Sequence, residues 1–135
     1  MHSKEIRSFN MSRIRSKDTK PEMIVRKFLF RKGFRYRLHD KKLPGSPDIV
    51  MKRRKTVIFI HGCFWHSHEG CRYAVMPKSN VEYWQPKIQR NKTKDNFAYD
   101  QLLKLNWKVI VIWECMLKKT VQPQTLEELL GNLSI

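Results

Sequence analysis

The sequence lacks the features that mark membrane and secreted proteins. None of its 135 residues belongs to an apolar run of about 18, the least that spans a bilayer. Residues 1–22 hold no apolar stretch like the core of a secretory signal. Three cysteines are an odd number and few for a disulfide framework, so we expect a reduced, cytoplasmic compartment.

Acidic residues are also scarce, with 12 Asp and Glu against 28 Lys and Arg and a net charge of +16. Solubility does not require such an excess of one sign, so the composition favours a protein that binds a polyanion. Apolar runs separate the basic clusters, which argues against one disordered tail. These clusters are Arg13–Lys20, Arg26–Arg37, Lys52–Lys55 and Lys87–Lys94.

The first half of the chain predicts a helix followed by three strands. Thr19 and Glu22 form the pattern of a capping box around Pro21, and Gly33 is placed to end that helix. Strict alternation over residues 34–39 predicts a half-buried strand. Two short apolar runs on either side of the basic turn Lys52–Lys55 predict a hairpin.

The second half predicts helix, strand and helix. Residues 80–105 read as helical, with a break near Pro86. Residues 107–114 form a continuous apolar strand that we expect at the centre of the sheet. Residues 123–135 predict a closing helix. With no repeat and no linker, residues 1–135 are predicted to form one α/β domain with a mixed sheet, and residues 1–20 a basic arm that contacts its ligand.

Cysteine and histidine gather after the second hairpin strand. Cys63, His66, His68 and Cys71 lie within nine residues, and Cys115 follows the last strand. Thiolates and imidazole are the ligands that a closed, tetrahedral zinc site prefers. The spacing permits either histidine as the fourth ligand beside the three cysteines. The alternative is that the cysteines are reduced core residues.

A second group of residues suggests hydrolysis. Asp48 starts a strand, where a carboxylate packs poorly, although it could simply close the preceding turn. The antiparallel hairpin brings Asp48 towards His61. A carboxylate that holds Mg²⁺, with His61 or His66 as the base, suits phosphodiester hydrolysis. Glu22 and Asp95 have simpler local explanations, as a capping residue and as an ion-pair partner.

Four segments together resemble the very short patch repair (Vsr) endonuclease family, over Ser8 to Cys115. They are "NMSRIRSKDTKPE", "LPGSPDIV", "HGCFWHSHEGC" and "WKVIVIWEC". The resemblance implies a fold similar to type II restriction endonucleases. It also implies an enzyme that nicks one strand beside a T:G mismatch left by deamination of 5-methylcytosine, and so starts repair.

The resemblance also implies a role for single residues. Asp48 would bind Mg²⁺ together with the main-chain carbonyl of Ile60. His66 would be the general base with Glu22 beside it, and His61 would act near the scissile phosphate with support from Asp95. Zinc would take Cys63, His68, Cys71 and Cys115. The residues expected to insert into DNA are Phe64 and Trp65, with Met11 and Ile14 from the other groove.

Two positions depart from the family pattern. Ile60 stands where its best-known members have Thr, and Glu69-Gly70 makes the zinc loop one residue longer. Two other functions stay open: a zinc-stabilised DNA-binding module without catalysis, and a less selective restriction-like nuclease. The expected partners are mismatched duplex DNA and mismatch-repair proteins. We expect a monomer, because one mismatch has no palindrome, in the nucleoid of a bacterial cytoplasm.

Overall fold

The computed structural model describes residues 18–66, 68–74 and 79–133 and contains a four-stranded sheet in the order β1-β2-β3-β4. β1 pairs with β2 and β2 with β3 in antiparallel fashion, whereas β3 and β4 are parallel. This confirms the predicted mixed α/β sheet. The strands are β1 (Arg37–Leu38), β2 (Ile49–Met51), β3 (Thr56–His61) and β4 (Lys108–Trp113).

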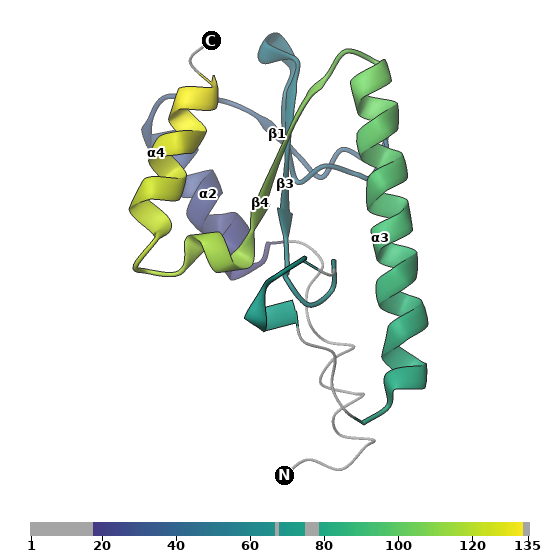
Figure 1. The fold of residues 1–135 in the computed structure, drawn as a ribbon. Helices are drawn as coiled ribbons and strands as arrows, with labels where there is room; N and C mark the ends of the chain where they lie inside the picture. The colour runs from purple at the N-terminus through teal and green to yellow at the C-terminus, as the bar shows by residue number, and fades with distance from the viewer. Residues whose placement is uncertain (1–17, 67, 75–78, 134–135) are drawn as a thin grey trace.

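Helices cover both faces of this sheet (Figure 1). α2 (Lys20–Arg31) and α4 (Gln122–Leu133) lie on one face, and the long α3 (Val81–Lys104) lies on the other. The order of elements agrees with the sequence prediction. None of the helices described has the length and apolarity needed to cross a membrane.

The ends of α2 follow the local sequence signals. The hydroxyl of Thr19 accepts a hydrogen bond from the backbone N–H of Glu22 at 3.4 Å. The helix stops at Arg31, and Gly33 adopts φ +91°, a left-handed conformation that glycine takes at little cost. Val25 and Leu29 are fully buried and join the core beneath the sheet. The predicted start and end of this helix are confirmed.

The hairpin also forms as predicted, although the strand before it is shorter than expected. β2 and β3 pair around the turn that begins at Lys52, and Lys55 takes a left-handed φ of +51°. Exposure alternates along residues 34–38, but only Arg37 and Leu38 pair with β2. β2 has three residues, so it offers few partners to a longer β1.

β4 lies at the end of the described sheet, so the prediction of a central strand was wrong. Its continuous apolar character has another cause. Val109 and Val111 pack towards the α3 side, while Ile110 and Ile112 pack towards α2 and α4. An edge strand with helices on both faces needs apolar residues at every position.

α3 runs unbroken through Pro86, so the predicted break is also wrong. Pro86 lies in the second turn and leaves only the carbonyl four residues earlier, that of Glu82, without its helical partner. Both residues are exposed, so water can bond that carbonyl. The inward stripe of α3 begins before the proline at Trp84 and continues past it with the buried residues Ile88, Ala98 and Leu102.

The loop before β2 presses directly on the sheet and on α3 at Gly45. A Cβ atom there would lie 2.7 Å from the Cβ of Ala98 and 3.1 Å from the Phe59 ring, and φ is +75°. We expect Gly45→Ala to reduce the free energy of unfolding by about 2–4 kcal/mol through overpacking and strain. Urea denaturation measures this. Gly131→Ala on α4 is the matched control, since nothing lies within 4 Å of it, and should stabilise by about 0.5–1 kcal/mol. Equal stability of Gly45→Ala and the unaltered protein would contradict the packing argument.

Candidate functional site

Three strand ends meet at one edge of the sheet. Asp48 precedes β2, and the antiparallel pairing of Ile49 with Ile58 carries it towards the end of β3. The parallel pairing of His61 with Trp113 brings the end of β4 to the same edge. A cavity of about 320 Å³ opens here. Its lining includes five sequence-predicted residues: Asp48, Ile60, His61, His66 and Asp95.

The Asp48 carboxylate is largely buried and held in place. Its Oδ2 accepts a hydrogen bond from the backbone N–H of Ile60 at 2.7 Å, and its Oδ1 lies 3.7 Å from Nδ1 of His39. The pKa of Asp48 is raised to about 6, mainly because burial disfavours the charged form; the Ile60 N–H opposes this shift and the charge of Glu22 adds to it. A carboxylate in these surroundings gains most from a cation placed beside it.

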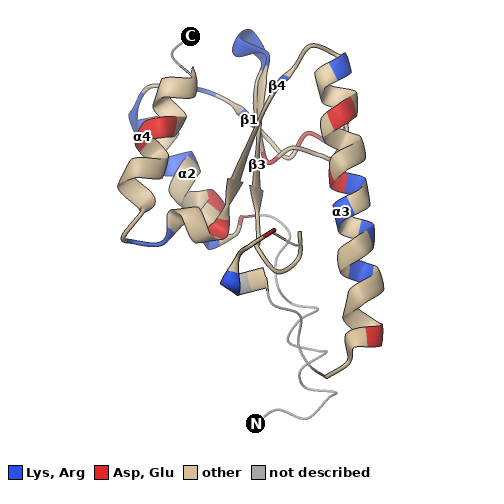
Figure 2. Cartoon of the chain, in the orientation of Figure 1, with Lys and Arg blue, Asp and Glu red and all other residues tan. Residues whose placement is uncertain are grey.

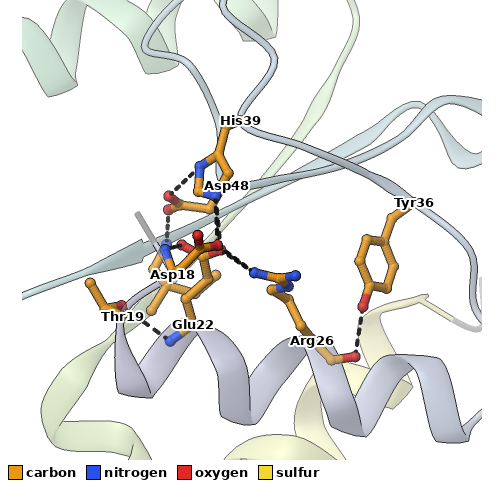
Figure 3. A network of polar contacts seen from close by, with 8 residues as sticks. Asp18, Thr19, Glu22, Arg26, Tyr36, His39 and Asp48 are labelled. Atoms are coloured by element: carbon orange, nitrogen blue, oxygen red, sulfur yellow. Dashed lines mark hydrogen bonds and ion pairs between the residues drawn. The ribbon is translucent and has the colours of Figure 1, made fainter. Parts of the chain in front are cut away.

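Glu22 is only 1% exposed and belongs to a polar network at the start of α2 (Figure 3). Its Oε2 lies 2.9 Å from Nε2 of His39 and 3.2 Å from Nη1 of Arg26. Its Oε1 accepts a hydrogen bond from the backbone N–H of Asp18 at 3.2 Å. The resemblance placed Glu22 beside His66; the structure instead places it against His39 and Arg26. Neither His39 nor Asp18 was predicted as a site residue.

Two histidines stack at the cavity wall. Nδ1 of His66 is hydrogen-bonded to Oδ2 of Asp95 at 2.5 Å, and Nε2 of His61 to the Tyr99 hydroxyl at 2.5 Å. Their ring centroids are 3.8 Å apart with an 18° angle between planes. Asp95 lies 4.0 Å from His61, so it hydrogen-bonds His66 rather than the histidine that the resemblance assigned to it. The pKa of His61 is lowered to about 4, mainly by burial and also by neighbouring His66, while Asp95 opposes the shift, so His61 is neutral at pH 7.

Three cysteines and one histidine converge beside this cavity. One ligand atom from each of Cys63, His68, Cys71 and Cys115 lies within 4.8 Å of all the others. The Sγ of Cys115 is 3.5 Å from Nδ1 of His68. The backbone N–H of Cys115 donates to the Sγ of Cys63 at 3.4 Å. Trp113 lies flat on the His68 ring at 4.1 Å and 5°. The spacing left two histidines open, and His68 is the one that lies among the cysteines.

The aromatic pair Phe64 and Trp65 is half-buried and stands in the chain between Cys63 of the cysteine cluster and His66 of the stacked histidines. Both rings pack edge-on against Trp84 of α3, at 5.4 and 5.6 Å between centroids. The backbone carbonyl of Trp65 accepts a hydrogen bond from Asn91 at 3.0 Å. The pair therefore rests on α3 in this structure. Met11 and Ile14, which were also expected to insert into DNA, lie outside the described residues. Most of the basic arm lies outside them as well.

The raised pKa of Asp48 predicts a pH-dependent stability. Because its folded pKa of about 6 exceeds the ordinary 3.8, the folded protein holds this proton longer than the unfolded chain. Asp48 then adds stability below pH 3.8 and loses that contribution as the pH rises through about 6. In Mg²⁺-free buffer, Asp48→Asn should be the more stable protein, by a margin that grows by about 2 kcal/mol between about pH 4.5 and pH 7.5.

Urea denaturation across this pH range measures the margin. Asp100→Asn on the exposed side of α3 is the matched control and should give a margin that does not change with pH. A constant margin for Asp48→Asn would show that the carboxylate ionises as easily as an exposed one.

Comparison with known proteins places the chain in a family. The family profile described as "DNA mismatch endonuclease Vsr" matches residues 1–72. The chain is 51% identical over 128 residues to the type II nicking enzyme V.NmeAIP of Neisseria meningitidis serogroup A, covering 94% of this chain and 91% of that protein. It is 39% identical over 118 residues to the DNA mismatch endonuclease Vsr of Escherichia coli, covering 87% and 75%. The type II nicking enzyme V.XorIIP of Xanthomonas oryzae is 49% identical over 115 residues, with 85% and 84% covered. The chain therefore belongs to the Vsr family of DNA mismatch endonucleases.

Proposed function

We propose that this protein is a Mg²⁺-dependent endonuclease that nicks one strand of duplex DNA beside a T:G mismatch. Such mismatches arise from deamination of 5-methylcytosine, and the nick would start very short patch repair. One observation carries the proposal: the buried Asp48 carboxylate and the His66–Asp95 pair line the same cavity. An anionic metal ligand and an oriented base are what metal-assisted phosphodiester hydrolysis requires.

Asp48 and Ile60 supply the ligands for the cation in this proposal. A carboxylate and a main-chain carbonyl are oxygen ligands of the kind that Mg²⁺ prefers. Bound there, Mg²⁺ would neutralise the charge that develops on the phosphate oxygens. The Ile60 N–H fixes one oxygen of Asp48, and the buried charge of Glu22 makes this side of the cavity more favourable for a cation.

His66 is the base in this proposal. With Asp95 accepting its Nδ1–H, the ring keeps its proton on Nδ1 and its lone pair on Nε2. Nε2 can then take a proton from the water that attacks the phosphorus. Asp95 stabilises the imidazolium that results, and the stacked His61 keeps the ring in its plane.

The charge of the chain supports a DNA substrate. Figure 2 shows Lys and Arg along the middle of α3, where residues 87–94 supply four of the 28 basic side chains. Such a surface neutralises backbone phosphates without reading sequence. The printed names of the relatives, a mismatch endonuclease and nicking enzymes, support the same substrate.

Phe64 and Trp65 are proposed to pry the duplex beside the mismatch. A T:G wobble pair stacks less well than a normal pair, so unstacking it costs less than the usual few kcal/mol. Insertion would exchange the contacts of both rings with Trp84 for contacts with bases. Phe64 and Trp65 directly precede His66 in the chain. Their insertion would therefore set the position of the scissile phosphate relative to His66, the proposed general base.

The cysteine and histidine cluster is proposed to hold a structural zinc ion. Tetrahedral zinc with bonds of about 2.0–2.3 Å places its ligands about 3.3–3.8 Å apart, close to the separations in the cluster. Cys63, His68, Cys71 and Cys115 would fill all four positions and leave none for a substrate. Gly70, at φ +69°, accommodates the extra residue of the loop. The site would therefore fasten the loop that carries His66.

The fold is proposed to be a member of the restriction-endonuclease-like class. Its support is the mixed sheet between helices and the carboxylate of Asp48, which directly precedes β2 at the sheet edge. The histidine pair occupies the neighbourhood where that class commonly places a lysine after an acidic residue.

Nicking should depend on the Asp48 carboxylate. A labelled duplex with one T:G pair and Mg²⁺ should be cut once, in the T strand, and Asp48→Asn should slow this about 1,000-fold because it loses an anionic metal ligand. Binding to the mismatched duplex should survive. Asp100→Asn should cut normally. Equal cutting of T:A duplexes would favour the less selective nuclease, and no cutting across a panel of flanking sequences would favour the binding module.

The metal content tests the zinc proposal. Elemental analysis of the purified protein should find about one zinc per chain, and Cys115→Ser should lose most of it and several kcal/mol of stability. Asp48→Asn provides the control, because it should keep its zinc. A zinc content far below one per chain in the unaltered protein would contradict the proposal.

A further inference from the structure

We propose that Tyr99 is a positioning residue of this active site. Its hydroxyl fixes the orientation of the His61 ring, and the His66 ring stacks on that ring. The proposal depends on the proposed role of His66 as the base. Neither the sequence pattern nor the family resemblance indicates a role for Tyr99.

We infer that the hydrogen bond between Tyr99 and His61 runs from the hydroxyl to the ring nitrogen. The Tyr99 hydroxyl lies 2.5 Å from Nε2 of His61 in a part-buried contact, and Nε2 is the acceptor that the described residues offer to its proton. Buried hydroxyl donors are almost always satisfied. The hydroxyl therefore donates to Nε2, which places the ring proton of His61 on Nδ1.

This bond removes Nε2 of His61 from the chemistry. A nitrogen that accepts from Tyr99 cannot also bond a phosphate oxygen or a water without first breaking that contact. The resemblance implied that His61 acts near the scissile phosphate. We infer instead that its contribution is the ring itself, which stacks on His66 at 3.8 Å between centroids.

Tyr99 is itself held from two sides. Its ring packs edge-on against Phe59 of β3 at 5.3 Å and 71°, and Phe59 is buried. Along α3, Tyr99 lies one turn after Asp95, so the two side chains share a face of the helix. One helix turn therefore holds both histidines, with Asp95 on His66 and Tyr99 on His61.

Tyr99→Phe removes the hydroxyl alone and tests this arrangement. In the protein without DNA, ¹⁵N NMR of the histidine rings should show His61 as the Nδ1–H tautomer, with Nε2 as an acceptor. In Tyr99→Phe that single-tautomer pattern should be lost. This arm needs no catalysis, so it tests the hydrogen bond even if the protein proves not to nick T:G duplexes. An unchanged His61 pattern would overturn the proposal.

The kinetic arm separates positioning from stability. Tyr99→Phe should lower kcat for nicking about tenfold and leave KM for the duplex within about twofold, since only the base is misplaced. Tyr36→Phe is the matched control. It removes a tyrosine hydroxyl that donates to the backbone carbonyl of Arg26 at 2.8 Å and does not line the cavity of His61 and His66, so it should lose similar stability but keep kcat. If both variants lose kcat alike, the effect is one of stability and the proposal is wrong.

A double-mutant cycle completes the test. His61→Phe keeps a flat ring under His66 but has no nitrogen for Tyr99 to bond. In that background, adding Tyr99→Phe should change kcat less than twofold, because the interaction is already absent. A full tenfold loss in the same background would show that Tyr99 acts by another route and would overturn the proposal.

Discussion

The parallel pairing of β3 with β4 is the contact on which the site depends. Six residue pairs, from Thr56 with Lys108 to His61 with Trp113, set the two strand ends level. The segments that follow then place Cys63 beside Cys115. A slip of one residue would move each end by about 3.3 Å and turn every side chain to the opposite face. The cysteine cluster would come apart and the two stacked histidines would face away from α3, so both groups depend on one register.

Local signals explain the parts of the fold that the sequence predicts. Thr19 and Gly33 mark the ends of α2 because capping and left-handed backbone are decided within a few residues. The basic turn at Lys52–Lys55 marks the hairpin for the same reason. The grouping of Cys63, His68, Cys71 and Cys115 could be anticipated from their residue types, although their spacing alone did not distinguish His68 from His66.

The rest depends on what lies across the fold. His39 and Tyr99 carry no local pattern, since each matters only through a partner distant in sequence, Glu22 for one and His61 for the other. The apolar residues along β4 indicate that both faces of this strand are covered. They do not indicate which strands pair with it. The proline at position 86 does not by itself predict whether the helix breaks. That depends on whether water can reach the carbonyl of Glu82, which loses its helical hydrogen bond.

One stripe of α3 contacts the aromatic pair, the two stacked histidines and the core in turn. Trp84 packs against the aromatic pair, and Asn91 bonds the backbone carbonyl of Trp65. Asp95 and Tyr99 bond the rings of His66 and His61. Leu102 packs in the core. At 100° per residue these five lie within about 80° of one another around the helix. An insertion or deletion of one residue inside this span would rotate one part of the stripe against the other by about 100°. Evolution can therefore change the length of α3 at its ends, but between Trp84 and Leu102 the number of residues is fixed by the helical repeat.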